Sequence, residues 1–252
     1  MSSFDRFSHW LRSELFSSLQ SLKTVLLPPC CGVCRTALPQ SPSYGLCAHC
    51  QELLLFNQGP SCPICALPGM TSEPCVRCQE KPLPISRLVA PFLYGGVLAD
   101  AWSAVKFHQR EGLAKALGRH LASFPGVREA ALCATCLVPV PLGRRRGRQR
   151  GFNQSALLAR ELSHHWQIPV SYALRRIVET QKQSDLSLLG RQANVSGVFV
   201  PRKNVRGKCL LVDDIVTSGE TIRHAARALW VAGAEDVVVI ALARTENLLD
   251  SV

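Results

Sequence analysis

The pattern of apolar and polar positions divides the chain into three parts. Residues 4–27 carry apolar side chains at three- and four-residue steps, which predicts one amphipathic helix that ends before two prolines. Residues 30–78 consist of short segments that are rich in turn residues and interrupted by cysteines. From residue 87 onward, apolar runs of strand length alternate with helical patterns. We therefore expect an N-terminal helix over 1–28, a cysteine-rich unit over 29–80, a linker at 80–84 and an α/β domain over 85–248.

The third part has the alternation that is typical of a parallel sheet with helices on both faces. Its apolar runs are bounded by turn residues, and its helical segments are longer than ten residues. The expected strands are 88–94, 137–140, 208–212 and 237–242, and the expected helices are 99–120, 152–166 and 220–232.

Eight cysteines form four Cys-x2-Cys pairs, which is the spacing of zinc knuckles. Two knuckles supply the four thiolates of one tetrahedral zinc site, so four knuckles predict two structural zinc ions. We favour pairing of the knuckles in order along the chain, although the spacing also permits interleaved pairs. The predicted ligands are Cys31, Cys34, Cys47, Cys50, Cys62, Cys65, Cys75 and Cys78.

The remaining cysteines and one histidine leave alternatives open. Cys30 could replace Cys31 as a ligand, whereas His49 lies inside a knuckle in which thiolates are better placed. An iron–sulfur cluster or disulfides are the competing interpretations of the cysteine-rich part. Cys133 and Cys136 form a fifth pair that leads into an apolar strand, which favours a buried or edge position over redox chemistry.

Charge separates the same parts of the chain. Lys and Arg number 29 against 18 Asp and Glu, which gives a net charge of +11. Residues 1–84 contribute 6 basic and 5 acidic side chains, whereas residues 85–252 contribute 23 and 13. This excess predicts an anionic partner for the α/β part. The sequence contains no apolar run of transmembrane length and no convincing signal peptide, so we expect a cytoplasmic protein with reduced cysteines.

A buried strand ends at Asp213 and Asp214 and is followed by a short loop of Thr, Ser and Gly. Ligands of open α/β sheets bind at the carboxyl ends of the strands, where a helix N-terminus attracts phosphate. The two carboxylates would repel a phosphate, but they suit ribose hydroxyls or hydrated Mg2+. The stretch therefore predicts a sugar-phosphate site. Its candidate phosphate-binding residues, called the phosphate loop below, are Thr217, Ser218, Gly219, Glu220 and Thr221.

Arginines are concentrated after the strand expected at 137–140. Five of them occur within seven residues, a density at which like charges repel unless an anion is bound. We expect a mobile loop at the same edge of the sheet, which contacts pyrophosphate or a nucleic-acid backbone, and we expect Asn153 to cap the helix that follows. The candidate residues are Arg144, Arg145, Arg146, Arg148 and Arg150.

The segment 209–221 closely resembles the phosphoribosyl pyrophosphate (PRPP) loop of type I phosphoribosyltransferases. Together with the knuckles, it makes the chain resemble the ComF family, whose members join a double zinc ribbon to a type I phosphoribosyltransferase-like domain. The resemblance extends over residues 29–245. The other residues that carry it are Lys106 and Phe107, Val138-Pro139-Val140-Pro141, Arg150-Gly151-Phe152 with Asn153 and Gln154, and Gln183, Leu186, Arg191 and Asn194.

This resemblance implies that Asp213 and Asp214 hold ribose hydroxyls and that the phosphate loop binds the 5-phosphate of PRPP, with Mg2+ as its companion. It also implies a role in natural competence or DNA utilisation, with single-stranded DNA as a partner. Two alternatives stay open. One is a working phosphoribosyltransferase of unknown acceptor, in which the two aspartates are catalytic. The other is a zinc-ribbon DNA-binding regulator, which is weakened because residues 30–78 contain only two basic residues, Arg35 and Arg77.

Overall fold

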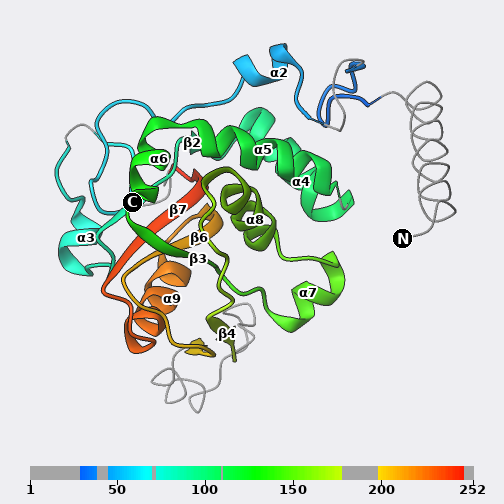
Figure 1. Ribbon diagram of the computed structural model, residues 1–252. Helices are drawn as coiled ribbons and strands as arrows, with labels where there is room; N and C mark the ends of the chain where they lie inside the picture. Colours follow the sequence, from blue (N-terminus) through cyan, green and yellow to red (C-terminus); the bar gives the residue numbers. More distant parts are fainter. Residues whose placement is uncertain (1–28, 39–44, 70–71, 109, 178–197, 247–252) are drawn as a thin grey trace, which may run out of the picture.

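A computed structural model of the chain describes residues 29–38, 45–69, 72–108, 110–177 and 198–246 (Figure 1). The helix expected over 4–27 lies outside these residues, as do Gln183, Arg191 and Asn194. In the part of the chain that is described, no helix has the length and apolar character needed to cross a membrane.

A five-stranded parallel sheet forms the centre of the α/β part, in the order β1-β7-β6-β3, with β2 also paired to β7. The two middle strands are nine residues long and almost fully buried, because helices cover both faces. The strands are β1 (Arg87–Val89), β2 (Phe92–Leu93), β3 (Ala134–Pro139), β6 (Lys208–Val216) and β7 (Asp236–Arg244). The strand expected at 88–94 is thus two short strands, separated at Pro91, which has no N–H for the ladder.

The helices lie in two layers, one on each face of the sheet (Figure 1). Alternate residues of β6 show this division: Leu210 and Val212 pack with the first layer, whereas Cys209 and Leu211 pack with α9. The first layer comprises α4 (Gly96–His108), α5 (Glu111–Ser123), α6 (Pro125–Ala131) and α8 (Gln154–Trp166), and the second is α9 (Glu220–Val231).

The single helix expected over 99–120 is wrong, because α4 ends at His108 and α5 begins at Glu111. A continuous helix would carry the buried face of α4 on to Gln109 and Gly112, which have no apolar side chain to bury. The break turns Leu113 and Leu117 toward the core instead. The sequence interpretation also missed α6, although Pro125 occupies the favoured first position of that helix.

Short elements complete the described chain. A two-stranded antiparallel sheet pairs β4 (Leu174–Arg176) with β5 (Phe199–Pro201), and α7 (Arg144–Arg150) precedes α8. The cysteine-rich part contains two five-residue helices, α2 (Ala48–Glu52) and α3 (Val76–Glu80), each of which begins directly after a cysteine.

Candidate functional site

The knuckle cysteines form two groups of four, and the groups follow the order of the chain. Within each group the Sγ atoms all lie within 4.8 Å of one another. Zn–S bonds of about 2.3 Å in a tetrahedron place two sulfurs ~3.8 Å apart. The Sγ atoms of Cys34 and Cys47 are 3.5 Å apart, and those of Cys65 and Cys75 are 3.7 Å apart. The residues present therefore fit two structural zinc ions, and the sequential pairing is confirmed.

We call these groups the first cluster (Cys31, Cys34, Cys47 and Cys50) and the second cluster (Cys62, Cys65, Cys75 and Cys78). Backbone amides stabilise the sulfurs of both. The Cys50 N–H donates to the Sγ of Cys47 over 3.4 Å, and the Cys75 N–H donates to the Sγ of Cys62 over the same distance. Neither Cys30 nor the exposed His49 belongs to either group of described ligands.

The fifth cysteine pair is divided between surface and core. Cys133 is exposed and has a φ of 60°, whereas Cys136 is buried in β3. The Sγ of Cys136 lies 3.6 Å from that of Cys209 on the neighbouring strand. Cys136 is therefore a core residue of the sheet, and Cys133 is a surface residue at its edge.

A pocket of about 300 Å3 lies at the carboxyl ends of β3 and β6. It brings together residues that are far apart in the sequence: a helix lysine, the residues around the start of α8, the acidic pair and part of the phosphate loop. Among the candidates named above, the pocket is lined by Lys106, Arg150, Asn153, Gln154, Asp213, Asp214, Thr217 and Thr221.

The acidic pair occupies the last part of β6, where the two carboxyl groups have different partners. Asp214 Oδ2 accepts a hydrogen bond from Trp102 Nε1 at 2.9 Å and lies 3.4 Å from Lys106 Nζ. Asp213 Oδ1 accepts from the Ser155 hydroxyl at 3.1 Å and from the Asp214 N–H at 2.9 Å. The two aspartates therefore receive different electrostatic support.

The pKa values of the two aspartates move apart. Burial and the neighbouring Asp214 charge raise the pKa of Asp213 well above its usual 3.8. Burial also acts to raise the pKa of Asp214, but Lys106 and the Trp102 hydrogen bond outweigh it and hold that pKa below 3.8. Asp214 is thus the carboxylate that carries the charge, and Asp213 is the one that takes up a proton more readily.

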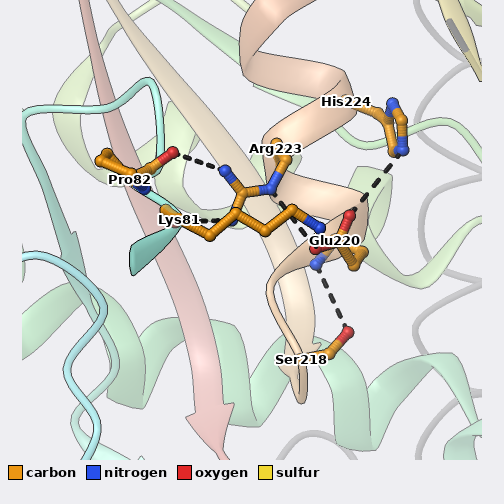
Figure 2. Close-up of polar contacts among 6 residues, drawn as sticks. All are labelled: Lys81, Pro82, Ser218, Glu220, Arg223 and His224. Carbon is orange, nitrogen blue, oxygen red and sulfur yellow. Dashed lines mark hydrogen bonds and ion pairs between the residues drawn. The ribbon is translucent and has the colours of Figure 1, made fainter. Parts of the chain in front are cut away.

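The phosphate loop follows β6 and leads into α9. Gly219 has a φ of 80° at the N-cap of this twelve-residue helix, a conformation that favours glycine. Thr217 and Thr221 line the pocket. The Glu220 carboxylate instead forms ion pairs with Lys81 at 2.8 Å and Arg223 at 3.3 Å, and the Ser218 hydroxyl accepts from the Glu220 N–H at 3.4 Å (Figure 2). The Glu220 side chain is therefore engaged by these two cations and is not among the residues that line the pocket.

The arginine-rich segment is the helix α7 and not the expected loop. Gly143 precedes it, and Gly151 ends it with a φ of 76°, so glycines bound a segment that charge repulsion alone would leave extended. The backbone of Arg144, Arg145 and Arg146 lies in the first turn, and the Arg148 side chain is exposed.

The end of α7 is tied to the pocket through the start of α8. Arg150 Nη1 donates to Gln154 Oε1 at 3.2 Å. Asn153 caps α8, as expected, by accepting from the Ala156 N–H at 3.4 Å, and its amide donates to the Val140 carbonyl at 2.9 Å. These contacts hold the α8 start against the end of β3, where the pocket lies.

The sequence analysis missed Trp102, Tyr94, Ser155 and Arg176, of which Ser155 lines the pocket and donates to Asp213. Trp102 lies one helical turn before Lys106, so the i, i+4 spacing was a usable signal that both side chains share one face of α4. Tyr94 and Arg176 also line the pocket. Arg176 comes from β4, and no pattern in the sequence indicates that this short strand reaches the site.

Comparisons with known proteins agree with this architecture. Residues 22–79 match the double zinc ribbon domain family. The DNA utilization protein YhgH of Salmonella typhi is 36% identical over 228 residues, covering 87% of this chain and 98% of the relative. Competence protein F of Haemophilus influenzae is 29% identical over 223 residues, covering 84% and 90%. Competence protein ComFC of Bacillus subtilis is 26% identical over 201 residues, covering 76% and 80%.

Among solved structures, a glutamine PRPP amidotransferase from B. subtilis, complexed with ADP and GMP, shares 23% identity with a TM-score of 0.35. That match covers 51% of this chain and 26% of the amidotransferase chain, so it spans about a quarter of the latter. The YhgH match extends over most of this chain and nearly the whole length of the relative. The chain therefore belongs to the ComF family, and in it a double zinc ribbon precedes an α/β domain with a parallel sheet.

Proposed function

We propose that the chain binds PRPP with Mg2+ in the pocket at the carboxyl ends of β3 and β6. The observation that carries this proposal is the convergence of an acidic pair, a helix N-terminus with two threonines, and the cations Lys106 and Arg150 on one pocket. The aspartates would hold the ribose hydroxyls, and the phosphate loop would bind the 5-phosphate. The arginines of α7 would bind the pyrophosphate.

The fit of Mg2+ to this site follows from its donor set. Hard cations take carboxylate and phosphate oxygens, and the two aspartates are the carboxylates of the pocket. When bound with PRPP, Mg2+ would neutralise pyrophosphate charge. Lys106 already stabilises the ionised Asp214 carboxylate in the free protein. The carboxylate would therefore be in place before the ligand hydroxyls bind to it.

Thermal unfolding in the presence of ligand tests this proposal. We expect PRPP with Mg2+, at about 100 times its Kd, to stabilise the chain by ~2.7 kcal/mol. Asp214→Asn should remove most of this shift, because it removes the charged member of the acidic pair. Asp100→Asn makes the same chemical change at an exposed position on α4 and should keep the shift. Absence of a shift at millimolar ligand would refute PRPP binding.

The names of the relatives extend the proposal to DNA uptake or utilisation. We propose that single-stranded DNA is a second partner, with the arginines of α7 binding its phosphates, in a cytoplasm whose reducing conditions suit zinc-bound thiolates. Substitution of the five candidate arginines by Gln should flatten the dependence of DNA affinity on salt. Lys115→Gln on α5 is a single-charge control away from the pocket. An equal salt slope in the five-fold variant would contradict the role of α7.

A working phosphoribosyltransferase is the second candidate, and the polarised acidic pair favours it. A carboxylate fixed by Trp102 and Lys106 is placed to stabilise positive charge that develops on a ribose ring. Pyrophosphate release from PRPP, measured across a panel of nucleobases, separates this function from binding alone. Turnover that Asp214→Asn abolishes would establish the enzyme, and no release with any base would leave the binding function.

A further inference from the structure

Arg244, at the end of β7, joins the second cluster to the phosphate loop. Its side chain is 1% exposed. Nε donates to the carbonyl of Cys65 at 3.1 Å, and Nη1 donates to the carbonyls of Val216, at 2.8 Å, and Thr217. One guanidinium therefore holds the backbone of a knuckle and the backbone that begins the phosphate loop. Since its fork is planar and rigid, the two segments are fixed relative to one another.

A second buried arginine makes a similar connection from α9 (Figure 2). Arg223 Nη1 and Nη2 donate to the carbonyls of Pro82, at 2.5 Å, and Lys81, at 2.8 Å, and its Nε donates to Glu220 Oε1 at 3.3 Å. Lys81 and Pro82 directly follow α3, the helix that carries Cys78. The segment expected to be a linker is thus fastened to the first turn of the helix whose N-terminus forms the phosphate site.

Charge and apolar packing point the same way. None of the ion pairs formed by the described residues involves Arg244, and a buried cation needs a compensating charge. Zn2+ with four thiolates carries a net charge of about −2, and the second cluster lies beside this guanidinium. Leu83 packs against the same cysteines. Its Cδ2 also lies 3.6 Å from the point at which a Cβ atom would stand on Gly219 of the loop.

We propose that the second cluster is a support for the phosphate loop, with Arg244 and Arg223 as positioning residues, so that zinc retention and sugar-phosphate binding are energetically coupled. This inference rests on the proposed sugar-phosphate site. The coupling is reciprocal: if zinc favours the binding-competent loop, then a bound sugar phosphate must raise the affinity of the second cluster for zinc by the same factor. We expect this gain to be expressed as slower loss of zinc.

The first cluster provides an internal control for this coupling. It packs on α5, where Gly32 lies against Leu113. Neither Arg244 nor Arg223 hydrogen-bonds to a residue of this cluster in the described structure. The two zinc ions of one molecule should therefore respond differently to the same ligand.

The test follows zinc transfer from the full chain to a chromogenic chelator, with and without ribose 5-phosphate. Cys34→Ser, at the exposed ligand of the first cluster, assigns which phase of release belongs to which cluster. We expect ribose 5-phosphate to slow release from the second cluster by about fivefold or more and to leave the first unchanged. Equal rates with and without the sugar phosphate, in a protein whose melting temperature the same ligand raises, would overturn the coupling and leave the binding site standing.

Variants test the same connection without ligand. Arg223→Gln should accelerate release from the second cluster by about tenfold, since it removes charged hydrogen bonds to the segment after α3. Arg227→Gln, an exposed arginine one turn later on α9, is the matched control and should have no effect. Arg244→Gln should act in the same direction as Arg223→Gln. Equal release from the Arg223→Gln and Arg227→Gln chains would overturn the positioning role even if no sugar phosphate bound.

Discussion

The two cysteine clusters have the same ligands and nearly the same sulfur spacing, yet they are placed differently in the molecule. In the first cluster Cys34 is exposed, and the segment packs on α5, a helix of the first layer. In the second, Cys62, Cys65 and Cys78 are each 3% exposed, and the neighbouring Ala66 belongs to the core beneath α9. Identical metal chemistry therefore serves a peripheral unit in one case and the support of the phosphate loop in the other.

Removal of one ligand from each cluster tests this difference with the largest expected effect. Cys78→Ser should destabilise the chain by about 4 kcal/mol or more, because the loss of zinc also releases the segment that Arg223 and Arg244 hold. Cys34→Ser should cost less and should preserve ligand-induced stabilisation. Urea unfolding with and without PRPP and Mg2+ measures both. An equal loss of unfolding free energy in the two variants would contradict the different roles of the two clusters.

Gly219→Ala tests the loop end of the connection. Gly219 has a left-handed backbone with a φ of 80°, so alanine at this position should lower the free energy of unfolding by about 1–2 kcal/mol. The nearest atoms nevertheless leave room for its methyl group. The change should also weaken sugar-phosphate binding and speed zinc release from the second cluster alone. Gly96→Ala, at a φ of 46° with open space around it, is the matched control for backbone strain. A Gly219→Ala chain that binds ribose 5-phosphate normally would argue against the loop as the site.

Asp213→Asn separates stability from binding. The pKa of Asp213 is higher in the folded chain than the value of 3.8 that it has in the unfolded chain. This carboxyl therefore lowers the free energy of unfolding once the pH rises above 3.8. The variant should therefore be more stable than the native chain by about 1 kcal/mol at neutral pH, with the difference disappearing as the pH falls toward 4. It should nevertheless lose the protection of the second cluster by ribose 5-phosphate. Melting curves between pH 4 and 8 measure the effect, and a native-like pH profile would contradict it.

The smallest effect is expected at the exposed ion pair that joins the segment after α3 to the first turn of α9. Lys81 and Glu220 form an exposed ion pair, which is worth about 0.2–1 kcal/mol and is screened by salt. Lys81→Gln should thus cost less than 1 kcal/mol at low salt and almost nothing at 1 M salt. A loss that persisted at high salt would show that Lys81 acts through packing instead of charge.

Much of this architecture follows from local patterns in the sequence. The four Cys-x2-Cys pairs predicted both clusters, because the knuckle spacing fixes two sulfurs toward one metal. The apolar run before Asp213, followed by the phosphate loop, predicted β6, the helix start and the pocket edge, since strand, turn and helix signals are contiguous there. Asn153 was likewise predicted as a cap.

What could not be predicted depends on contacts between distant segments. Arg244 lies two residues beyond the strand expected at 237–242, and its hydrogen bond to Cys65 joins residues 179 positions apart. The contact between Arg223 and Pro82 crosses 141 residues. Repulsion among the arginines favours a loop, whereas the glycines at 143 and 151 bound the segment as the helix α7. Arg176 reaches the pocket only through the pairing of β4 with β5.

Calorimetric titration of PRPP with Mg2+ into the zinc-loaded native chain tests the central claim most directly. We expect saturable binding of one PRPP per chain, and we expect the heat to disappear in the Asp214→Asn chain but not in the Asp100→Asn chain. Binding that survives Asp214→Asn unchanged, or the absence of any binding at millimolar PRPP, would contradict a sugar-phosphate site at the carboxyl end of β6.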